Sequence, residues 1–212
     1  MAQTEPSPDC VPQAALDAYV QHSIERKANV YASLSPEPGQ TVFLGSSLIE
    51  EGRWHELFGD DTILNRGIGA ETTHDLLMRL DAIIAYQPAR LFLYTGGNNL
   101  SRRGETAQQA AAGVAEVLAV LVEGLPDTAL YLSTLLPREA RHAENIKAVN
   151  AELARLAEKQ GVALVDAHAA LSDPNGALRA ELTNDGIHLN GEGYRLWASH
   201  IGRSLDMREV KP

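Results

Sequence analysis

The sequence has little cysteine, few aromatic residues and no long apolar run. These absences argue against an internal disulfide, an aromatic core and a membrane span. The 212 residues include a single cysteine, Cys10, so no disulfide can form within the chain. Aromatic residues make up 5% of the chain and hydrophobic residues 44%, which predicts a core that is mainly aliphatic. Because no run of about 18 apolar residues exists, we expect no membrane insertion.

Positive charge is also scarce. Lysine and arginine total 18 against 28 aspartates and glutamates, which gives a formal net charge of -10. Nucleic-acid-binding proteins present a basic face to phosphate groups, so this acidic balance argues against a nucleic-acid partner. The N-terminal residues lack the basic and apolar segments of a secretory signal, and one cysteine is compatible with a reducing compartment. We therefore expect a cytoplasmic protein.

Short apolar runs alternate with longer segments of helical periodicity. We expect a flexible arm over residues 1–12 and a helix over 13–34, which packs on the flank of a sheet or docks on a partner subunit. The second option leaves a homo-oligomer open. Continuous apolar strands between helices predict a parallel sheet covered on both faces, in one domain over 13–212. The expected strands are residues 41–44, 62–65, 90–94, 129–134 and 162–166.

Ligands of such sheets bind outside the carboxyl ends of the strands, and the first strand ends in a Gly-Ser-Ser turn. Gly45 allows a tight turn, and Ser47 would stand near the N-terminus of the next helix, where the helix dipole favours developing negative charge. A serine in this place could act as a nucleophile if a base removed its proton. The alternative is that Ser46 or Ser47 only caps the helix.

The loop before the last helix carries Asp185 and His188 in the pattern Asp-x-x-His. An imidazole that acts as a base needs an acceptor on its other nitrogen, and Asp185 can fold back to supply one. A plain turn is one alternative. A metal site of His168, Asp166 and His188 is a poorer one, because no two histidines have the short spacing typical of zinc sites.

Two further loops can supply donors to an oxyanion. The stretch "TGGNNL" contains Gly97 and Asn98, whose backbone and amide can approach a ligand closely, although a β-turn explains it equally well. The stretch "NRGIGAETT" has free backbone N–H groups around Gly69, and its departure from G-x-G-x-x-G argues against a dinucleotide site. With the serine and the Asp-x-x-His loop, these segments form a complete set for acyl transfer.

In their order along the chain, "FLGSSLIE", "LNRGIGAETT", "LYTGGNNL" and "NDGIHLNGEGY" resemble the four blocks of the GDSL or SGNH hydrolase superfamily over roughly residues 40–200. "NRGIGAETTHDLLMRL" and the Gly-x-Asn-Asn form of the third block are most similar to platelet-activating-factor acetylhydrolase-like esterases. The resemblance implies a flavodoxin-like three-layer α/β/α sandwich with five parallel strands, and a mechanism without metal or cofactor. It also implies a triad of Ser47, His188 and Asp185.

The oxyanion hole implied by the resemblance consists of the backbone N–H groups of Ser47 and Ala70 and the side chain of Asn98. Ala70 departs from the glycine that the family has there, which keeps the N–H but adds a methyl group. Ser46 and Asn99 stand where many members have aspartate. The residues expected to support the site are Gly45, Ser46, Gly69, Glu71, Thr72, Gly97 and Asn99, and Arg66 is expected to pair with a nearby carboxylate.

The sequence thus predicts a serine esterase acting on a small-molecule ester with a short acyl group, acetyl above all, carried by a carbohydrate or a related alcohol. Within the same class, a lysophospholipase or thioesterase is the alternative. From a different class, a doubly wound protein that binds phosphate or sugar without catalysis would use the same glycine-rich loops and leave Ser47 as a helix cap.

Overall fold

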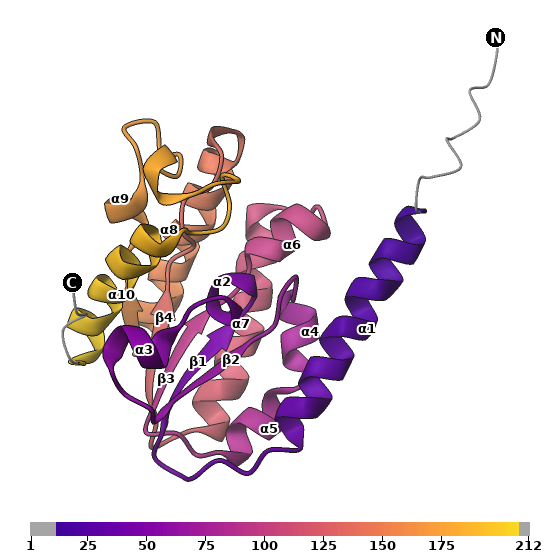
Figure 1. Ribbon diagram of the computed structural model, residues 1–212, viewed down its shortest axis with the longest axis vertical. Coiled ribbons are helices and arrows are strands. Elements are labelled where there is room, and N and C mark those ends of the chain that lie inside the picture. The colour runs from indigo at the N-terminus through magenta and orange to yellow at the C-terminus, as the bar shows by residue number, and fades with distance from the viewer. Residues whose placement is uncertain (1–11, 208–212) are drawn as a thin grey trace.

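A computed structural model describes residues 12–207, so all of the expected N-terminal arm except Pro12 lies outside the described residues. At its centre is a sheet of five parallel strands in the order β2-β1-β3-β4-β5 (Figure 1). Each strand lies within two residues of the predicted run, so the expected α/β fold is confirmed. The strands are β1 (Thr41–Gly45), β2 (Ile63–Gly67), β3 (Arg90–Tyr94), β4 (Ala129–Ser133) and β5 (Ala163–Val165).

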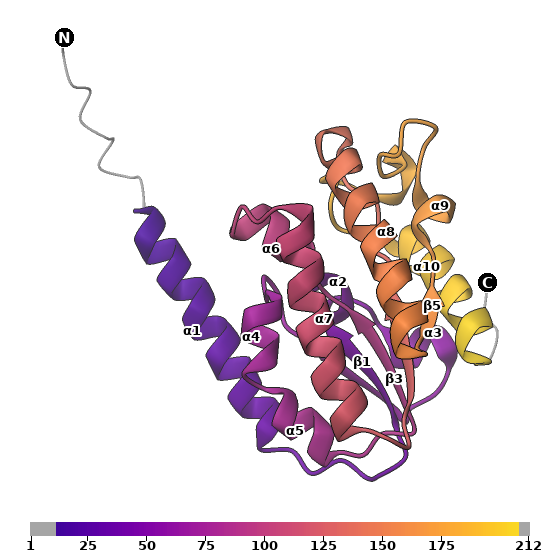
Figure 2. The same cartoon turned by 180° about the vertical axis from the view of Figure 1, so that it is seen from behind.

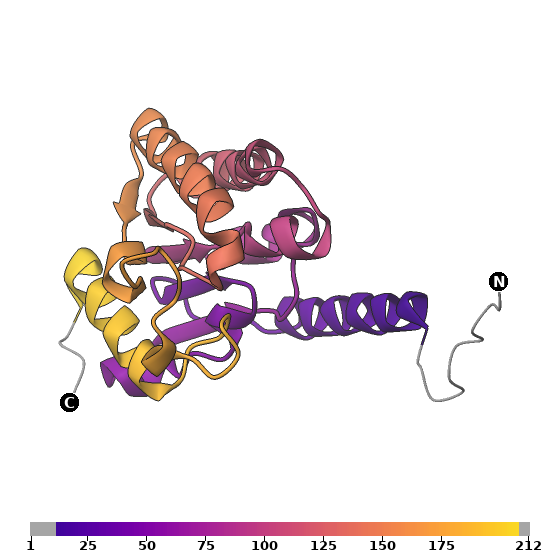
Figure 3. The ribbon, with the colours of Figure 1, turned by 90° about the horizontal axis from the view of Figure 1, so that it is seen from above.

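Helices fill the connections and cover both faces of the sheet. Helices α7 and α8 lie on one face and α3 and α10 on the other, which makes the three layers (Figure 2, Figure 3). The helices are α1 (Gln13–Ala32), α2 (Ser47–Glu50), α3 (Trp54–Phe58), α4 (Thr73–Leu77), α5 (Leu80–Ala85), α6 (Gly97–Arg102), α7 (Ala107–Gly124), α8 (Ala143–Gln160), α9 (His168–Leu171) and α10 (Gly191–Leu205), with short 3-10 turns η1 (Ala140–His142) and η2 (Ala180–Leu182).

The segment after β2, which has continuous helical periodicity, forms two helices instead of one. Helix α4 ends at Leu77 and α5 begins at Leu80, and Arg79 between them leaves the helical region with φ −126° and ψ 7°. The side chain of Arg79 is buried, because it turns inward to reach a carboxylate. A tertiary contact therefore interrupts a helix that local periodicity favours.

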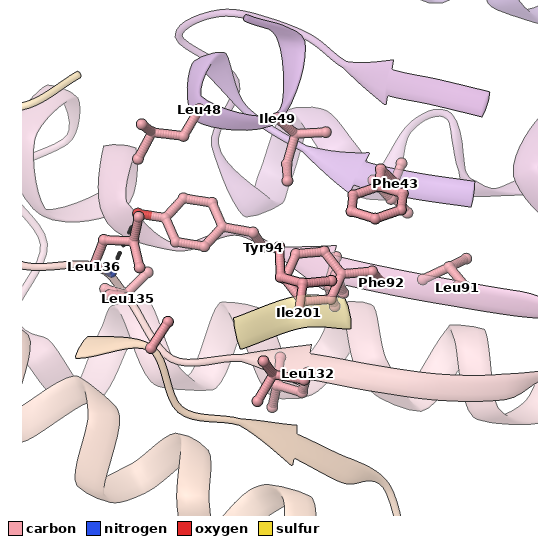
Figure 4. Packing of buried hydrophobic residues seen from close by; sticks show 14 of the residues in the cluster. Phe43, Leu48, Ile49, Leu91, Phe92, Tyr94, Leu132, Leu135, Leu136 and Ile201 are labelled. Carbon is pink, nitrogen blue, oxygen red and sulfur yellow. Dashed lines mark hydrogen bonds between the residues drawn. The ribbon is translucent and has the colours of Figure 1, made fainter. Parts of the chain in front are cut away.

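Both tryptophans and all three phenylalanines pack together with Tyr94 and Tyr194 in one part of the core. Trp54 stacks on Phe43 with ring centroids 4.7 Å apart and meets Trp197 edge-on at 5.2 Å. Figure 4 shows Tyr94 reaching from β3 toward the segment after β4, where its hydroxyl accepts a hydrogen bond of 3.4 Å from the N–H of Leu136. Close ring packing of this kind gives the carboxyl ends of β1 and β3 a rigid base.

Helix α1 packs on the body of the protein with its second half only. The ion pair of Lys27 with Glu50 and the hydrogen bond of 3.1 Å from the Tyr31 hydroxyl to the Gly67 carbonyl hold it at the β2 edge. The first half projects away from the sheet (Figure 1, Figure 3), and Ile24 is the one fully buried residue of the helix. The prediction that this helix packs along the sheet was therefore wrong for its first half.

Candidate active site

Ser47 lies where β1 ends and α2 begins. A Cβ at Gly45 would lie 2.0 Å from the carbonyl oxygen of Tyr94, so glycine is needed for β1 to lie this close to β3. Ser46 occupies the cap position of α2, but its side chain makes no capping hydrogen bond. The hydroxyl of Ser47 instead faces His188, with 3.1 Å between Oγ and Nε2. The geometry thus opposes the reading of these serines as simple helix caps.

The loop 183–189 folds around a single carboxylate. Asp185 Oδ2 lies 2.7 Å from Nδ1 of His188, while Oδ1 accepts hydrogen bonds from the backbone N–H groups of His188 at 2.7 Å and Ile187 at 2.9 Å. Thr183 closes the loop by donating its hydroxyl proton to the His188 carbonyl at 2.7 Å. The Asp-x-x-His spacing therefore fixes both the ring and the backbone that carries it.

These contacts set the ionisation of Asp185. Partial burial alone would raise the pKa of Asp185, but the hydrogen bonds from the ring and backbone of His188 and from Ile187 together hold that pKa well below its usual range. An ionised carboxylate on Nδ1 keeps the proton on that nitrogen. The other nitrogen, Nε2, is then free to accept the proton of Ser47.

The loop after β2 lies against Ser47 and presents a backbone donor. A Cβ at Gly69 would lie 4.0 Å from the Cβ of Ser47. The next residue, Ala70, has φ 64°, in the left-handed region that alanine avoids. No acceptor for its N–H occurs among the hydrogen bonds of residues 12–207, and its carbonyl accepts a hydrogen bond of 2.5 Å from Arg102. An N–H group left unpaired beside a serine hydroxyl is available to an oxyanion.

Asn98, in the first turn of α6, is held against the loop that carries Ala70. Its side chain is almost fully buried, and Nδ2 donates to the carbonyl of Glu71 at 2.9 Å. An amide nitrogen carries two protons, so one N–H fixes the orientation of the side chain and the other remains to donate. Ser47 adds its own backbone N–H, because the first N–H groups of a helix have no partner within the helix.

Asn99 and Thr73 tie the loops after β2 and β3 together. Asn99 Oδ1 accepts from the N–H of Thr73 at 3.0 Å, and its Nδ2 donates to the hydroxyl of Thr73 at 2.7 Å. Thr72 begins α4 with a capping box completed by Asp75. Close contact also restricts Gly97, where a Cβ would lie 2.6 Å from a guanidinium nitrogen of Arg138. Of the expected supporting residues, Asn99 thus joins the loops that carry Ala70 and Asn98, whereas Thr72 caps α4 and Gly97 lies against Arg138.

Three residues that the sequence analysis missed hold the nucleophile turn. Glu50 accepts the N–H of Gly69 at 3.0 Å. Tyr194 donates its hydroxyl proton to the Leu48 carbonyl at 3.0 Å. Asn65 donates from Nδ2 to three carbonyls of the segment after Ser47, namely Ile49 at 2.7 Å, Gly52 at 3.0 Å and Glu50 at 3.1 Å.

A local signal existed for only one of these three residues. Glu50 stands three positions after Ser47, so both lie on the same face of a helix. Asn65 and Tyr194 reach the turn from another strand and from the last helix, and nothing near them in the sequence marks these contacts.

The arginine that pairs with a carboxylate near the site is Arg79 and not the expected Arg66. Arg66 lies over the rings of Tyr31 and Tyr86, with 4.9 and 5.4 Å to their centroids, and it has no carboxylate partner among the ion pairs of residues 12–207. Arg79 makes the bidentate pair with Glu71 instead, with 2.6 Å from Nε and 2.7 Å from Nη2 to the two carboxylate oxygens. The prediction for Arg66 was therefore wrong.

The metal-site alternative does not match the geometry. His188 faces Ser47 and Asp185, whereas Nδ1 of His168 lies 3.1 Å from the hydroxyl of Ser172. Within residues 12–207 no three side chains of His, Cys, Asp or Glu gather closely enough to hold a metal ion. Among the same residues, no helix is both long and apolar enough to cross a membrane.

Residues 36–196 match the model of the GDSL-like lipase/acylhydrolase family. The chain belongs to this family. It is 27% identical to the human platelet-activating factor acetylhydrolase IB subunit alpha2 over 206 residues, which cover 92% of this chain and 88% of the relative. The human alpha1 subunit is 28% identical over 203 residues, which cover 85% of this chain and 86% of that subunit. The expected resemblance to these esterases is thereby confirmed.

Solved structures agree with this assignment. A Streptococcus pneumonia protein, solved as a platelet activating factor, superposes with a TM-score of 0.81 and 27% identity, covering 91% of this chain and 97% of its own. An acetyl xylan esterase shares the fold, with a TM-score of 0.64 and 21% identity over 78% of this chain and 99% of its own. As a GDSL-family acylhydrolase, the protein is an esterase that acts on carboxylic ester bonds.

Proposed function

We propose that this esterase hydrolyses short acyl esters, acetyl esters above all, with Ser47 as nucleophile, His188 as general base and Asp185 as the residue that orients the base. One observation carries the proposal. Three polar side chains from two distant parts of the chain stand in line, with 3.1 Å between Ser47 and His188 and 2.7 Å between His188 and Asp185. The first distance suits proton transfer from Ser47 to His188, and the second lets Asp185 orient the ring and stabilise its protonated form.

In the proposed reaction, Ser47 Oγ attacks the ester carbonyl carbon while its proton moves to Nε2 of His188. The N–H groups of Ser47 and Ala70 and the amide of Asn98 hold the oxyanion that forms. When the tetrahedral intermediate collapses, the bond to the alcohol breaks and His188 gives its proton to the leaving oxygen. Water then attacks the acyl-enzyme along the same proton path and releases the acid and the free serine.

Two features support a small acyl group and a larger alcohol. Ala70 adds a methyl group to the loop that holds the oxyanion, at a position where the resemblance implies glycine. The ring of His188, which receives the leaving oxygen, is 35% exposed, so a bulky alcohol such as a carbohydrate can extend into solvent. Two similar proteins are also named for acetyl esters: the platelet-activating factor acetylhydrolase subunit and the acetyl xylan esterase.

Initial rates on p-nitrophenyl acetate and p-nitrophenyl octanoate test this proposal. Ser47→Ala should abolish both rates. The matched control is Ser204→Ala, which removes an exposed serine in α10 whose hydroxyl only donates to the His200 carbonyl at 3.2 Å, and it should retain them. A preference for acetate would support the short acyl group. A Ser47-dependent preference for octanoate would refute it and favour a lysophospholipase or thioesterase.

A second probe separates the esterase from a protein that only binds phosphate or sugar. A fluorophosphonate reacts with a serine that a base activates, so it should label Ser47 in the wild-type protein and nothing in Ser47→Ala. His188→Ala should lose the labelling as well. An unlabelled wild-type protein would count against catalysis by Ser47.

A further inference from the structure

The loop that carries Ala70 is anchored by a buried ion pair whose members take no direct part in the proposed chemistry. We propose that Arg79, acting through Glu71, is a positioning residue that holds the Ala70 N–H and the Asn98 amide in place for the oxyanion. This inference rests on the proposed ester hydrolysis by Ser47.

Arg79 ties three segments together. Its guanidinium donates to Glu71 Oε1 at 2.6 Å and Oε2 at 2.7 Å, and the same Nη2 donates to the carbonyl of Arg66 at 2.9 Å. Arg66 belongs to β2 and Arg79 to the junction of α4 and α5. Glu71 belongs to the loop 68–72 after β2, which carries Ala70 and is called the oxyanion loop below. A planar guanidinium bound bidentately to a carboxylate fixes direction as well as distance.

Glu71 connects this anchor to both donors. It follows Ala70 directly, so its position restricts the backbone conformation of Ala70, whose N–H is the donor. Its carbonyl also accepts the hydrogen bond of 2.9 Å from Asn98. A movement of Glu71 would therefore shift both donors at once. The left-handed conformation of Ala70, with φ 64°, is unfavourable for alanine and persists only where the surroundings hold it.

Stability alone is a poor explanation for this pair. The side chains of Glu71 and Arg79 are only 1% and 5% exposed, and a buried ion pair often contributes no more than well-packed apolar residues would. Burial raises the pKa of the Glu71 carboxyl to about 7, although Arg79 opposes this rise. Nη1 of Arg79 has no partner within residues 12–207. A pair with these costs is better explained by the geometry that it imposes.

The test compares Arg79→Met, Arg79→Lys and Glu71→Gln with the control Arg66→Met. Arg66 is an equally buried arginine in the adjacent strand, but its guanidinium contacts two aromatic rings and a backbone carbonyl of β2 and none of the oxyanion donors. Rates on p-nitrophenyl acetate and melting temperatures would be measured for each folded variant.

We expect Arg79→Met and Glu71→Gln to lower kcat by about ten- to a hundredfold with little change in KM, since they misplace donors that act in the transition state. Arg79→Lys should recover part of the loss. A double variant that combines Arg79→Met with Glu71→Gln should be no slower than the slower single variant, because both residues act as one unit. Arg66→Met should lower the melting temperature and leave kcat nearly unchanged. Additive losses, or equal losses of kcat in Arg66→Met, would overturn the proposal.

A readout without turnover distinguishes this proposal from the proposed function. In NMR spectra, Arg79→Met should shift the backbone amide of Ala70 and the side-chain amide of Asn98, and Arg66→Met should leave both in place. Unshifted amides in Arg79→Met would refute the positioning role even if Ser47-dependent hydrolysis is observed. Shifted amides in a protein without Ser47-dependent hydrolysis would support the positioning and refute the proposed function.

Discussion

Removing a methyl group at Ala70 and adding one at Gly69 should have opposite effects on the stability of this protein. Ala70→Gly removes a methyl from a residue with φ 64°, a conformation that glycine adopts freely. Gly69→Ala adds one at a position where the new Cβ would lie 2.7 Å from Oε2 of Glu50. The first change relieves backbone strain, whereas the second disrupts the contact that holds Gly69.

The size of the first effect follows from two opposing contributions. The left-handed conformation costs alanine about 1–2 kcal/mol. Glycine has a more flexible unfolded chain, which offsets about 0.4–1 kcal/mol of that gain. Ala70→Gly should therefore stabilise the protein by about 0.5–1 kcal/mol, which raises the melting temperature of a domain of this size by about 1–4 °C. The N–H donor remains, so the rate on p-nitrophenyl acetate should stay within about threefold of wild type.

Gly69→Ala should lower both stability and turnover. A Cβ contact of 2.7 Å is too short to persist, so either the loop or Glu50 must shift. Because Oε2 is the end of a flexible side chain that can move away, the cost should be about 0.5–1.5 kcal/mol, roughly that of the hydrogen bond that is lost. The shift also weakens the hydrogen bond from the Gly69 N–H to Glu50 and moves the adjacent Ala70 donor, so kcat should fall about tenfold or more.

Thermal unfolding and initial rates of the two variants, measured beside wild type, check this reasoning. The ratio of octanoate to acetate hydrolysis adds a third readout, because removal of the Ala70 methyl should raise it if that methyl limits the acyl pocket. A lower melting temperature for Ala70→Gly would refute the strain argument. Wild-type turnover in Gly69→Ala would refute the claim that the loop must keep its position against Glu50.

Four further predictions concern the donors, the Asp185 pair and the support of the nucleophile turn. Asn98→Ala should lower kcat on the order of a hundredfold while the protein stays folded, and unchanged turnover in steady-state kinetics would exclude Asn98 from the oxyanion hole. The pH–rate profile should show no step for Asp185 above about pH 4, because the pKa of Asp185 is held below its usual range. The stabilisation from the Asp185 pair is correspondingly present above its unfolded-state pKa near 4 and lost only in stronger acid, which acid-unfolding curves of Asp185→Asn would check. Asn65→Ala removes the amide donor from the carbonyls of Glu50 and Gly52 and one of the donors to Ile49, and should destabilise the protein by about 1–3 kcal/mol, measured by urea unfolding.

Much of the fold could be predicted because it depends on local pattern. The five strands are continuous apolar runs, and α7 begins where Thr106 and Gln109 form a capping box that the sequence spells out. The Asp185–His188 contact was also predictable, since it closes within a four-residue loop. Each of these features depends on residues near one another in the chain.

Other features could not be predicted in this way. The periodicity around residues 73–86 favours one helix, and the burial of Arg79 breaks it into two. Arg66 and Arg79 both lie near Glu71 in sequence, and only packing decides that Arg66 meets aromatic rings while Arg79 meets the carboxylate. The exposure of the first half of α1 likewise depends on where its second half docks at the β2 edge.

The sequence by itself determined the layered α/β architecture, the order of its elements and the chemical groups placed after each strand, because apolar periodicity and turn residues act over short distances. Only the tertiary structure decided that Ser47 and His188, 141 residues apart, come within 3.1 Å of each other. It alone decided which arginine anchors the oxyanion loop. Those choices depend on how the helices and loops pack around the sheet, and no local pattern encodes a distance between segments so far apart in the chain.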